Sequence, residues 1–495
     1  MSDSKKTIVK TYREKYRPQF HFSPLEKWMN DPNGLVYHRG VYHLFYQYYP
    51  EGVVWGPMHW GHAVSRDLIH WEQKAIALYP DVHGWIFSGC AVVDIHNSSA
   101  LGTLQNPPLV AVFTYHNEER KKKGFTDYET QGIAYSVDNG ESWQSYKHNP
   151  VLANKESIKD FRDPKVFWYE KTQKWIMVLV AGDHARFYSS ENLITWNYLS
   201  AFGYEQGAHG GVWECPDLFP LPVSITGEEK WVLLISINSG APNGGSGTQY
   251  FIGDFNGEVF VSPQTEPQWL DHGTDNYATV TFNNVPDEKR ICIGWMNNWN
   301  YAEKVPTHPW RGAMTLPREL SLQEIRDTWF LCSYPLSAFE KLKDTVHTVR
   351  KKVEIVKACG FDGSFNQCEV RFHTTGQDFV IEFSNAENDI FFIECNRREK
   401  RFHVNRTQAG QTGFAESFAE GPHTMPIPLL PEGAIEIRII LDWSSIEIFL
   451  NKGQYVMTQQ VFPRSFFTRL QFKNRDTAQP LQIINLMHYK VKSVR

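Results

Sequence analysis

Short apolar segments separated by turn-forming residues dominate the first two thirds of the chain. Residues 41–48, 110–115, 175–180 and 231–237 are rich in β-branched and aromatic side chains, and each segment is soon followed by Gly, Pro, Asn or Asp. Apolar positions at helical spacing are scarce. Because many short strands with turns between them are typical of a propeller, sandwich or barrel, the sequence predicts an all-β fold.

A weak internal repeat favours the propeller. Residues 65–71 read Ser-Arg-Asp-Leu-Ile-His-Trp, residues 189–196 read Ser-Ser-Glu-Asn-Leu-Ile-Thr-Trp, and residues 136–143 read Ser-Val-Asp-Asn-Gly-Glu-Ser-Trp. Their spacing leaves room for a four-stranded blade, which takes roughly 40–50 residues. Each copy is predicted to be a hairpin turn in which Asp or Asn supplies side-chain hydrogen bonds and the Trp starts the outer strand. Unrelated Ser/Asp turns before aromatic residues are the alternative.

Alternation of apolar and polar residues returns in the last third of the chain. It is clearest at residues 353–356, 368–372, 379–383, 435–440 and 446–450. Strands with one apolar and one polar face fit an antiparallel β-sandwich. The amphipathic stretch 334–348 lies between the two patterns. We therefore expect a first domain at residues 1–335, a linker at 336–350 and a second domain at 351–495.

The composition is that of an ordinary globular protein except for its aromatic residues. Hydrophobic residues make up 41% and charged residues 21% of the chain, which is neither a disordered nor a fibrous composition. Trp, Tyr and Phe together reach 14%. A β-rich core uses many large rings on its pleated faces, and a carbohydrate site uses them to stack on sugars. Composition alone leaves both explanations open.

The charge balance argues against two classes of partner. The chain has 50 Lys and Arg against 55 Asp and Glu, a formal net charge of −5, so no excess positive field attracts nucleic acid or an anionic membrane. The longest apolar runs, 175–181 and 231–237, are far shorter than the roughly 20 residues of a membrane span. We expect neither nucleic acid nor a membrane as a partner.

Cysteines and the N-terminal residues bear on the cellular compartment. The 7 cysteines are odd in number and contain no C-x-x-C pair, so neither a disulfide framework nor a zinc knuckle is indicated. The first residues lack the apolar stretch of about 7–15 residues that a secretion signal requires. If Met1 is the native start, we expect a cytoplasmic protein.

Three carboxylates stand out because aromatic and turn-forming residues flank them. Asp31 lies in Trp-Met-Asn-Asp-Pro-Asn-Gly, where the Pro and Gly are expected to force a tight turn that presents the carboxylate at a loop tip. Asp163 lies in Phe-Arg-Asp-Pro, beside Arg162, whose guanidinium can fork onto a carboxylate. Glu214 lies in Gly-Val-Trp-Glu-Cys-Pro-Asp. Each of the three taken singly is more simply a solvated turn residue.

In order and spacing, the three motifs together resemble the signatures of glycoside hydrolase family 32, the β-fructofuranosidases. Further matches are Tyr-Gln-Tyr-Tyr-Pro at 46–50, Trp-Gly-His-Ala at 60–63, Phe-Ser-Gly at 87–89, Gly-Trp-Met-Asn-Asn-Trp at 294–299, Leu-Pro-Arg-Glu-Leu at 316–320 and Asp-Trp-Ser-Ser-Ile-Glu-Ile-Phe at 442–449. The resemblance spans residues 18–495. It implies a five-bladed β-propeller that carries the active site, followed by a C-terminal β-sandwich.

The resemblance also assigns roles to matching positions. Asp31 matches the nucleophile, Glu214 the general acid/base, and Asp163 the stabiliser that binds fructose hydroxyls. The implied fructose pocket is lined by Asn30, Gln47, Trp55, Phe87, Ser88, Arg162 and Trp295. Positive charge builds at the anomeric carbon as a ketosidic bond breaks, and an adjacent carboxylate can capture it. The departing oxygen needs a proton, and we expect an apolar flank and a neighbouring carboxylate to raise the pKa of the acid.

The function that the resemblance implies is a retaining hydrolysis that needs no metal and no organic cofactor. Its substrates would be small or oligomeric fructosides with a terminal β-D-fructofuranosyl residue. A fructosyltransferase on the same scaffold is one alternative, since it differs only in passing the fructosyl group to a sugar hydroxyl. A non-catalytic fructan-binding propeller is another, and it would lack one of the three carboxylates, all of which are present here.

The segment 271–278 bears on the substrate branch. Hydrolases of phosphorylated sucrose in this family carry Asp-Phe-Tyr-Ala-Pro-Gln, whereas this chain reads Asp-His-Gly-Thr-Asp-Asn-Tyr-Ala, similar to levanases, exo-inulinases and yeast-type invertases. We therefore expect unphosphorylated substrates: sucrose, fructo-oligosaccharides, and the ends of levan or inulin chains. The second domain has no matched catalytic residue, so we expect it to support the site or to provide a homo-oligomer contact.

Overall fold

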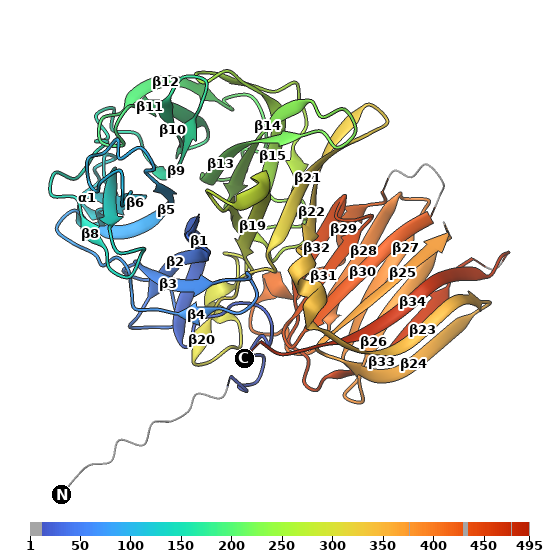
Figure 1. The fold of residues 1–495 in the computed structure, drawn as a ribbon. Coiled ribbons are helices and arrows are strands. Elements are labelled where there is room, and N and C mark those ends of the chain that lie inside the picture. Colours follow the sequence, from blue (N-terminus) through green and yellow to red (C-terminus); the bar gives the residue numbers. More distant parts are fainter. Residues whose placement is uncertain (1–11, 376, 429–433, 477, 495) are drawn as a thin grey trace, which may run out of the picture.

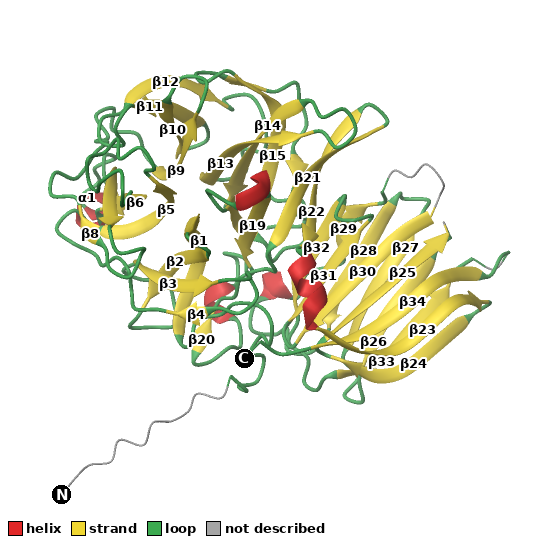
Figure 2. Ribbon diagram, viewed as in Figure 1, coloured by secondary structure: helices red, strands yellow, loops and turns green. Residues whose placement is uncertain are grey.

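The computed structural model describes residues 12–494 apart from 376, 429–433 and 477, and almost all of its regular structure is β-strand (Figure 2). The short helices of the described residues are α1 (Glu118–Lys122), η1 (Pro286–Glu288), η2 (Ala302–Lys304), η3 (Ser337–Leu342) and η4 (Glu416–Phe418). The all-β prediction is confirmed.

The strands up to Pro335 form five sheets arranged around a central axis (Figure 1). One sheet contains β1 (Lys27–His38), β2 (Val41–Tyr49), β3 (His59–Ser65), β4 (Glu72–Gln73) and β20 (Trp310–Arg311). The next contains β5 (Trp85–Val93), β6 (Leu109–His116), β7 (Glu129–Ser136) and β8 (Gln144–Ser145). Another contains β9 (Phe161–Tyr169), β10 (Lys174–Ala181), β11 (Ala185–Ser190) and β12 (Asn197–Phe202).

The remaining two sheets of this ring follow along the chain. The first of them contains β13 (Trp213–Pro222), β14 (Glu229–Ile237), β15 (Gly247–Phe255), β16 (Phe260–Val261) and β17 (Gln268–Trp269). The second contains β18 (Tyr277–Thr281), β19 (Arg290–Trp295), β21 (Arg318–Ile325) and β22 (Thr328–Pro335). The strands β1, β5, β9, β13 and β18 contact one another in a closed cycle, so they are the inner strands of a propeller.

Apolar side chains fill the space between neighbouring sheets. Val178 and Phe187 of the third sheet pack with Leu233 and Phe251 of the fourth, all with at most 1% of their surface exposed. Fully burying side chains of this size contributes about 1.5–3 kcal/mol each. Apolar packing between neighbouring sheets therefore stabilises the ring. The polar groups of the site lie on the inner strands.

The sequence repeat is a hairpin turn at the same place in three sheets, between β3 and β4, β7 and β8, and β11 and β12. In each copy, a serine hydroxyl and the Asp or Asn side chain two residues later accept backbone N–H groups; these pairs are Ser65 and Asp67, Ser136 and Asp138, and Ser190 and Asn192. The repeated Trp directly precedes the outer strand each time. The predicted turn chemistry is confirmed.

The rest of the chain is a sandwich of two six-stranded sheets. One has the order β23 (Lys343–Ile355), β34 (Leu481–Val491), β25 (Cys368–Thr375), β30 (Ala434–Asp442), β31 (Ser445–Leu450) and β32 (Tyr455–Gln460). The other has the order β24 (Ala358–Phe365), β33 (Phe467–Asn474), β26 (Phe379–Ser384), β27 (Ile390–Asn396), β28 (Arg401–Gln408) and β29 (His423–Pro426). Ile435, Ile437 and Ile439 alternate along β30 and enter the core between the sheets, as the period-two pattern predicts.

The segment proposed as a linker, residues 336–350, contains η3 and the first residues of β23. Strand β23 begins at Lys343 and pairs with β34 near the C-terminal end of the chain. The first strand of the sandwich thus starts inside this segment.

A buried network of charges joins the propeller to the sandwich. Arg318 donates to Asp271 Oδ2 and Glu447 Oε2, at 2.9 Å in each case. The ring of His21 lies between Asp442 Oδ2 at 2.8 Å and Glu447 Oε1 at 2.9 Å. These side chains are at most 1% exposed. Removing one partner would leave an uncompensated buried charge, so the network favours one relative placement of the two domains.

The ionisation of His21 makes this interface pH-dependent. Burial opposes the charge, but hydrogen bonds from the ring to Asp442 and Glu447 outweigh it and raise the pKa of His21 to about 9. A pKa that is higher in the folded state stabilises the fold below about pH 6.5, and the stabilisation is lost as pH rises through 9. A shift of that size corresponds to an upper bound of about 3 kcal/mol.

We expect His21→Gln to destabilise the protein at pH 6 and to have much less effect at pH 9.5. The measurement is the free energy of unfolding of wild type and variant at both pH values. His70→Gln is the matched control, because His70 also pairs with an aspartate but is 61% exposed. An equal loss of stability from His21→Gln at both pH values would contradict the prediction.

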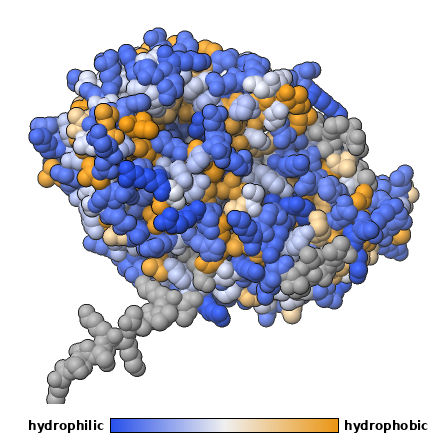
Figure 3. All heavy atoms as spheres, viewed as in Figure 1, coloured by the Kyte–Doolittle hydropathy of each residue, from blue (hydrophilic) through white to orange (hydrophobic). Residues whose placement is uncertain are grey.

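No helix of the described ranges is long and apolar enough to cross a membrane. The face of the molecule in Figure 3 is mostly hydrophilic, with hydrophobic residues in small patches. All seven cysteines lie in the described part of the chain and are free thiols.

Candidate active site

Each of the five inner strands is interrupted by a β-bulge, where its register against the neighbouring strand shifts. The bulges lie between Met29 and Pro32 in β1, Ile86 and Gly89 in β5, Arg162 and Lys165 in β9, Glu214 and Asp217 in β13, and Tyr277 and Val280 in β18. Bulges bend a strand and redirect its side chains. The Pro residues of the three carboxylate motifs lie at these bulges, where proline is tolerated within a sheet.

The bulges correct one expectation from the sequence. Asp31 does not lie at the tip of a tight turn; it is in strand β1 and is only 9% exposed. Asp163 has φ 63° and Cys215 has φ 45°, a left-handed backbone conformation that residues other than glycine seldom adopt. Strained backbone positions of this kind cluster at functional sites. Their occurrence at the bulges of β9 and β13 therefore indicates that a functional site lies at these bulges.

The carboxyl groups of Asp31 and Asp163 meet at Cys215. Its backbone N–H donates to Asp163 Oδ2 at 3.0 Å, and its Sγ lies 3.5 Å from Asp31 Oδ2 and 3.7 Å from Asp163 Oδ2. Ser88 Oγ donates to the same Asp31 Oδ2 at 2.7 Å. Asp31 Oδ1 is buried and has no hydrogen-bond partner in the described structure. Asp31 therefore has one oxygen held in place and the other free to react.

Glu214 is held by donors on both of its oxygens. Arg162 Nη2 donates to Oε1 at 3.0 Å, and the hydroxyl of Tyr277 donates to Oε2. Arg162 in turn is fixed by Glu129 Oε1 at 3.0 Å and Asp160 Oδ1 at 2.7 Å. The carboxyl group of Glu214 is thus oriented by β9 and β18, the inner strands on either side of its own strand β13.

Burial raises the pKa of all three carboxyl groups, and repulsion by neighbouring carboxylates adds to this for Asp163 and Glu214. Burial raises the pKa of Asp31, against hydrogen bonds from Ser88 that lower it. It also raises the pKa of Glu214, although Arg162 and Tyr277 lower it. For Asp163, burial and the charges of the other two carboxylates raise the pKa to about 8. Since Arg162 is the nearby cation that lowers the pKa of Asp163 and Glu214, the opposing effects of burial and of neighbouring carboxylates favour the protonated form of these two groups.

Of the residues predicted to line the pocket, Asn30 and Ser88 lie beside Asp31, and Gln47 joins β1 to β5 nearby. Asn30 Oδ1 accepts the indole N–H of Trp28 at 2.8 Å. The side-chain amide of Gln47 donates to Asn33 Oδ1 at 2.7 Å and to the Ile86 carbonyl at 3.1 Å. These bonds fix the side chains before any ligand binds, which limits the conformational entropy lost on binding.

Trp55 and Phe87 form a partly exposed aromatic group on the β5 side. Their ring centroids lie 6.1 Å apart at an angle of 70°. Phe87 also stacks on His116, with centroids 4.1 Å apart and an interplanar angle of 11°. Partly exposed aromatic faces of this kind are suitable contacts for the C–H faces of a sugar.

Trp295 is placed differently from the other predicted pocket residues. It has 0% of its surface exposed and packs against Trp28, Tyr277 and Trp299. It therefore supports the residues around the site from behind, and in this conformation it offers no surface for a sugar.

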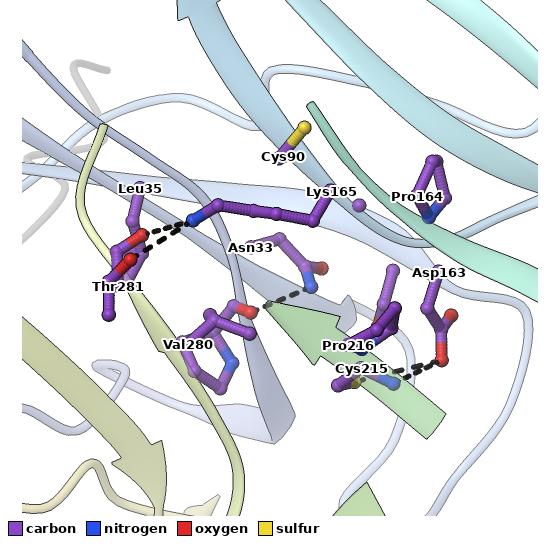
Figure 4. A pocket seen from close by; sticks show the side chains of 13 residues that line it. Asn33, Leu35, Cys90, Asp163, Pro164, Lys165, Cys215, Pro216, Val280 and Thr281 are labelled. Carbon is purple, nitrogen blue, oxygen red and sulfur yellow. Dashed lines mark hydrogen bonds between the residues drawn. The ribbon is translucent and has the colours of Figure 1, made fainter. Parts of the chain in front are cut away.

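A small cavity lies behind the carboxylates, with Asp163 and Cys215 on one side and Lys165 on the other (Figure 4). Its volume is about 10 Å³, enough for about one water molecule. Lys165 Nζ donates to the Thr281 carbonyl at 2.6 Å and lies 3.0 Å from Asp217 Oδ2. This ion pair joins the inner strands β9 and β13.

Two contributors to the site carried little signal in the sequence. Tyr277 lies in the Asp-Asn-Tyr-Ala segment that indicated the substrate branch, but nothing local shows that its hydroxyl meets Glu214. Glu129, which is 0% exposed and fixes Arg162, lies in no recognised motif. In the described residues no group of three or more His, Cys, Asp or Glu side chains is placed to hold a metal ion.

Comparisons with known proteins agree with this geometry. The family model for the glycosyl hydrolases family 32 N-terminal domain matches residues 21–335, and the model for the family 32 C-terminal domain matches residues 338–489. A levanase of Bacillus subtilis (strain 168) is 45% identical over 465 residues, which cover 91% of this chain and 67% of the levanase.

Two solved structures share both the fold and part of the sequence. A crystal structure of exo-inulinase from Aspergillus awamori has a TM-score of 0.89 and 34% identity, covering 98% of this chain and 100% of that one. The β-fructofuranosidase from Schwanniomyces occidentalis complexed with fructosyl-erythritol has a TM-score of 0.83 and 30% identity, covering 96% of this chain and 98% of that one. With both family models matched in order along most of its length, this chain belongs to glycosyl hydrolase family 32.

Proposed function

We propose that the protein is a retaining β-fructofuranosidase that releases terminal β-D-fructofuranosyl residues from sucrose, fructo-oligosaccharides and the ends of levan or inulin chains. The observation that carries the proposal is the cluster of three carboxyl groups: Asp31 and Asp163 meet at Cys215, and Glu214 lies close enough for the charge of Asp31 to raise its pKa. Family membership and relatives named levanase, exo-inulinase and β-fructofuranosidase support the same class of substrate.

In the proposed first step, Asp31 Oδ1 attacks the anomeric carbon of the fructosyl unit. This oxygen is the one without a hydrogen-bond partner, while Ser88 holds Oδ2. The bond from the anomeric carbon to the glycosidic oxygen breaks, and Glu214 gives its proton to that oxygen. The products are a fructosyl ester on Asp31 and the free alcohol of the leaving group.

In the second step, water attacks the anomeric carbon from the side that the leaving group vacated. Glu214, now a carboxylate, takes a proton from this water, and Asp31 leaves as a carboxylate. The two inversions restore the original β configuration. In this proposal Asp163 binds fructose hydroxyls, and the positive charge of Arg162 lies on the Glu214 side of the cluster. The chain's own residues suffice for every proton transfer.

Comparative kinetics on sucrose, sucrose 6-phosphate, inulin and levan test the substrate class. We expect measurable kcat/KM for sucrose and for at least one of the polymers, and a lower value for sucrose 6-phosphate. A kcat/KM for sucrose 6-phosphate more than about tenfold above that for sucrose, about 1.4 kcal/mol of transition-state preference, would overturn the assignment. Free fructose as the main product distinguishes hydrolysis from fructosyl transfer, which would yield longer oligomers.

A further inference from the structure

The loop between β17 and β18 lies directly against the sandwich. The N–H of His272 donates to the Val456 carbonyl at 2.7 Å, and Asp271 Oδ2 accepts the Thr458 hydroxyl at 2.6 Å. A Cβ on Gly273 would lie only 2.0 Å from the Thr458 carbonyl oxygen. Strand β32 and this propeller loop are therefore in a contact so close that a larger residue at 273 would force them apart.

A buried ion pair fastens the end of the same loop. Asp275 is 0% exposed and accepts from Arg406 Nη1 at 2.5 Å, from the Gln460 N–H at 2.9 Å and from the Tyr301 hydroxyl at 2.9 Å. Arg406 belongs to sandwich strand β28 and is 1% exposed, with its guanidinium 3.8 Å from the centroid of Phe418. The sandwich thus holds Asp275 through a buried ion pair with Arg406.

Asp275 lies two residues before Tyr277, the donor to Glu214 Oε2. Asn276, which separates them, is also buried and donates to Asp271 Oδ2 at 3.2 Å. Ala278 follows with φ 53°, inside the bulge of β18. The backbone on both sides of Tyr277 is thus fixed, and on its N-terminal side the partners of Asp275 include Arg406 and Gln460 of the sandwich.

We propose that Arg406 is a positioning residue for the acid/base: through Asp275 and Tyr277 the sandwich sets the orientation of the Glu214 carboxyl group. This inference rests on the proposed role of Glu214. It gives the second domain a part in the reaction without contact to substrate. Glu214 also faces Arg162 of β9 and Asp31 of β1, and neither contacts the loop 270–276. Loosening the loop therefore affects Tyr277, one of the two donors to Glu214, and leaves the other donor, Arg162, in place.

Leaving-group dependence separates this role from general support of the fold. Departure of an alkoxide, as from sucrose, needs the proton of Glu214, whereas fluoride is the anion of a much stronger acid and needs little protonation. A misoriented acid/base slows the first step with sucrose but not with β-D-fructofuranosyl fluoride. Loss of folded enzyme slows both in the same proportion.

The experiment compares kcat/KM for sucrose and for β-D-fructofuranosyl fluoride in full-length variants. For Arg406→Met we expect a loss of about tenfold or more on sucrose and less than about threefold on the fluoride, with Arg406→Lys between Arg406→Met and wild type. Arg438→Met is the matched control: Arg438 is a sandwich arginine, 1% exposed, that pairs with Glu369 and lies outside the loop contacts. It is expected to keep the wild-type ratio of the two activities.

Asp275→Asn is the second variant, for use if Arg406→Met does not fold. The asparagine keeps the shape of the side chain and removes its charge. The same ratio change is expected from it. Equal losses on both substrates, or no loss on either, would overturn the proposal. Glu214→Gln in the same assay tests the proposed function on which this inference rests. If Glu214→Gln lowers both activities equally, the assigned role of Glu214 is wrong. If Glu214→Gln lowers only the activity on sucrose while the Arg406 and Asp275 variants do not, only the positioning by Arg406 is contradicted.

Discussion

Replacing Asp31 with Asn is expected to lower kcat on sucrose by at least about 10⁴-fold, about 5 kcal/mol, while leaving the fold intact. The amide is neutral and a poor nucleophile, so the fructosyl ester cannot form. Asn keeps the shape of the side chain and can still accept the Ser88 hydroxyl that now bonds Asp31 Oδ2. The measurements are kcat on sucrose from steady-state kinetics and the Tm from a thermal unfolding curve.

Asp138→Asn is the control for this change, because Asp138 is an exposed aspartate in the repeat turn between β7 and β8. It is expected to keep wild-type kcat. An Asp31→Asn enzyme with more than about one hundredth of wild-type activity, in a preparation free of wild type, would show that another group is the nucleophile.

Replacing Glu214 with Gln is expected to lower kcat/KM on sucrose by about 10³-fold and to remove the alkaline limb of its pH profile. Burial raises the pKa of Glu214 above the ordinary value of 4.5, so the acid stays protonated to higher pH. Wild-type activity should then fall as pH rises through that pKa, because the proton for the leaving oxygen is lost. The glutamine variant has no such group to titrate.

The pH profile of kcat/KM for both enzymes makes the measurement. Glu228→Gln, at an exposed glutamate paired with Lys230, is the control and should keep the wild-type profile. A Glu214→Gln enzyme that retained the alkaline limb would place the titrating acid elsewhere, with Asp163 the next candidate because its pKa is raised to about 8.

The architecture could be predicted because the two patterns that indicate it, alternation along strands and the repeated turn, are local. Alternation along single strands, such as Ile435 to Ile439 in β30, fixes which face is buried. The Ser-x-Asp turns satisfy their own backbone groups, so their hydrogen bonds do not depend on distant partners. Both features could therefore be read without knowing what packs against them.

What the sequence did not predict depends on contacts between distant segments. Asp31 was expected in a loop, since proline normally interrupts a strand, yet its proline lies at a bulge of an inner strand. The first residues of β23 looked like a linker because their partner, β34, is at the other end of the chain. Tyr277 and Glu129 act on residues more than 30 positions away, and no local pattern marks such partners.

A double displacement through a fructosyl ester on Asp31, with Glu214 as acid and then base, retains the configuration of the anomeric carbon. Transfer to methanol gives the sharpest test of this mechanism, because the methyl fructoside does not change its anomeric form after release. Sucrose is turned over by the wild-type enzyme in aqueous methanol, and the methyl fructoside is identified by NMR. We expect methyl β-D-fructofuranoside, formed by two inversions. Methyl α-D-fructofuranoside as the product would mean a single displacement and would show that no fructosyl ester forms on Asp31.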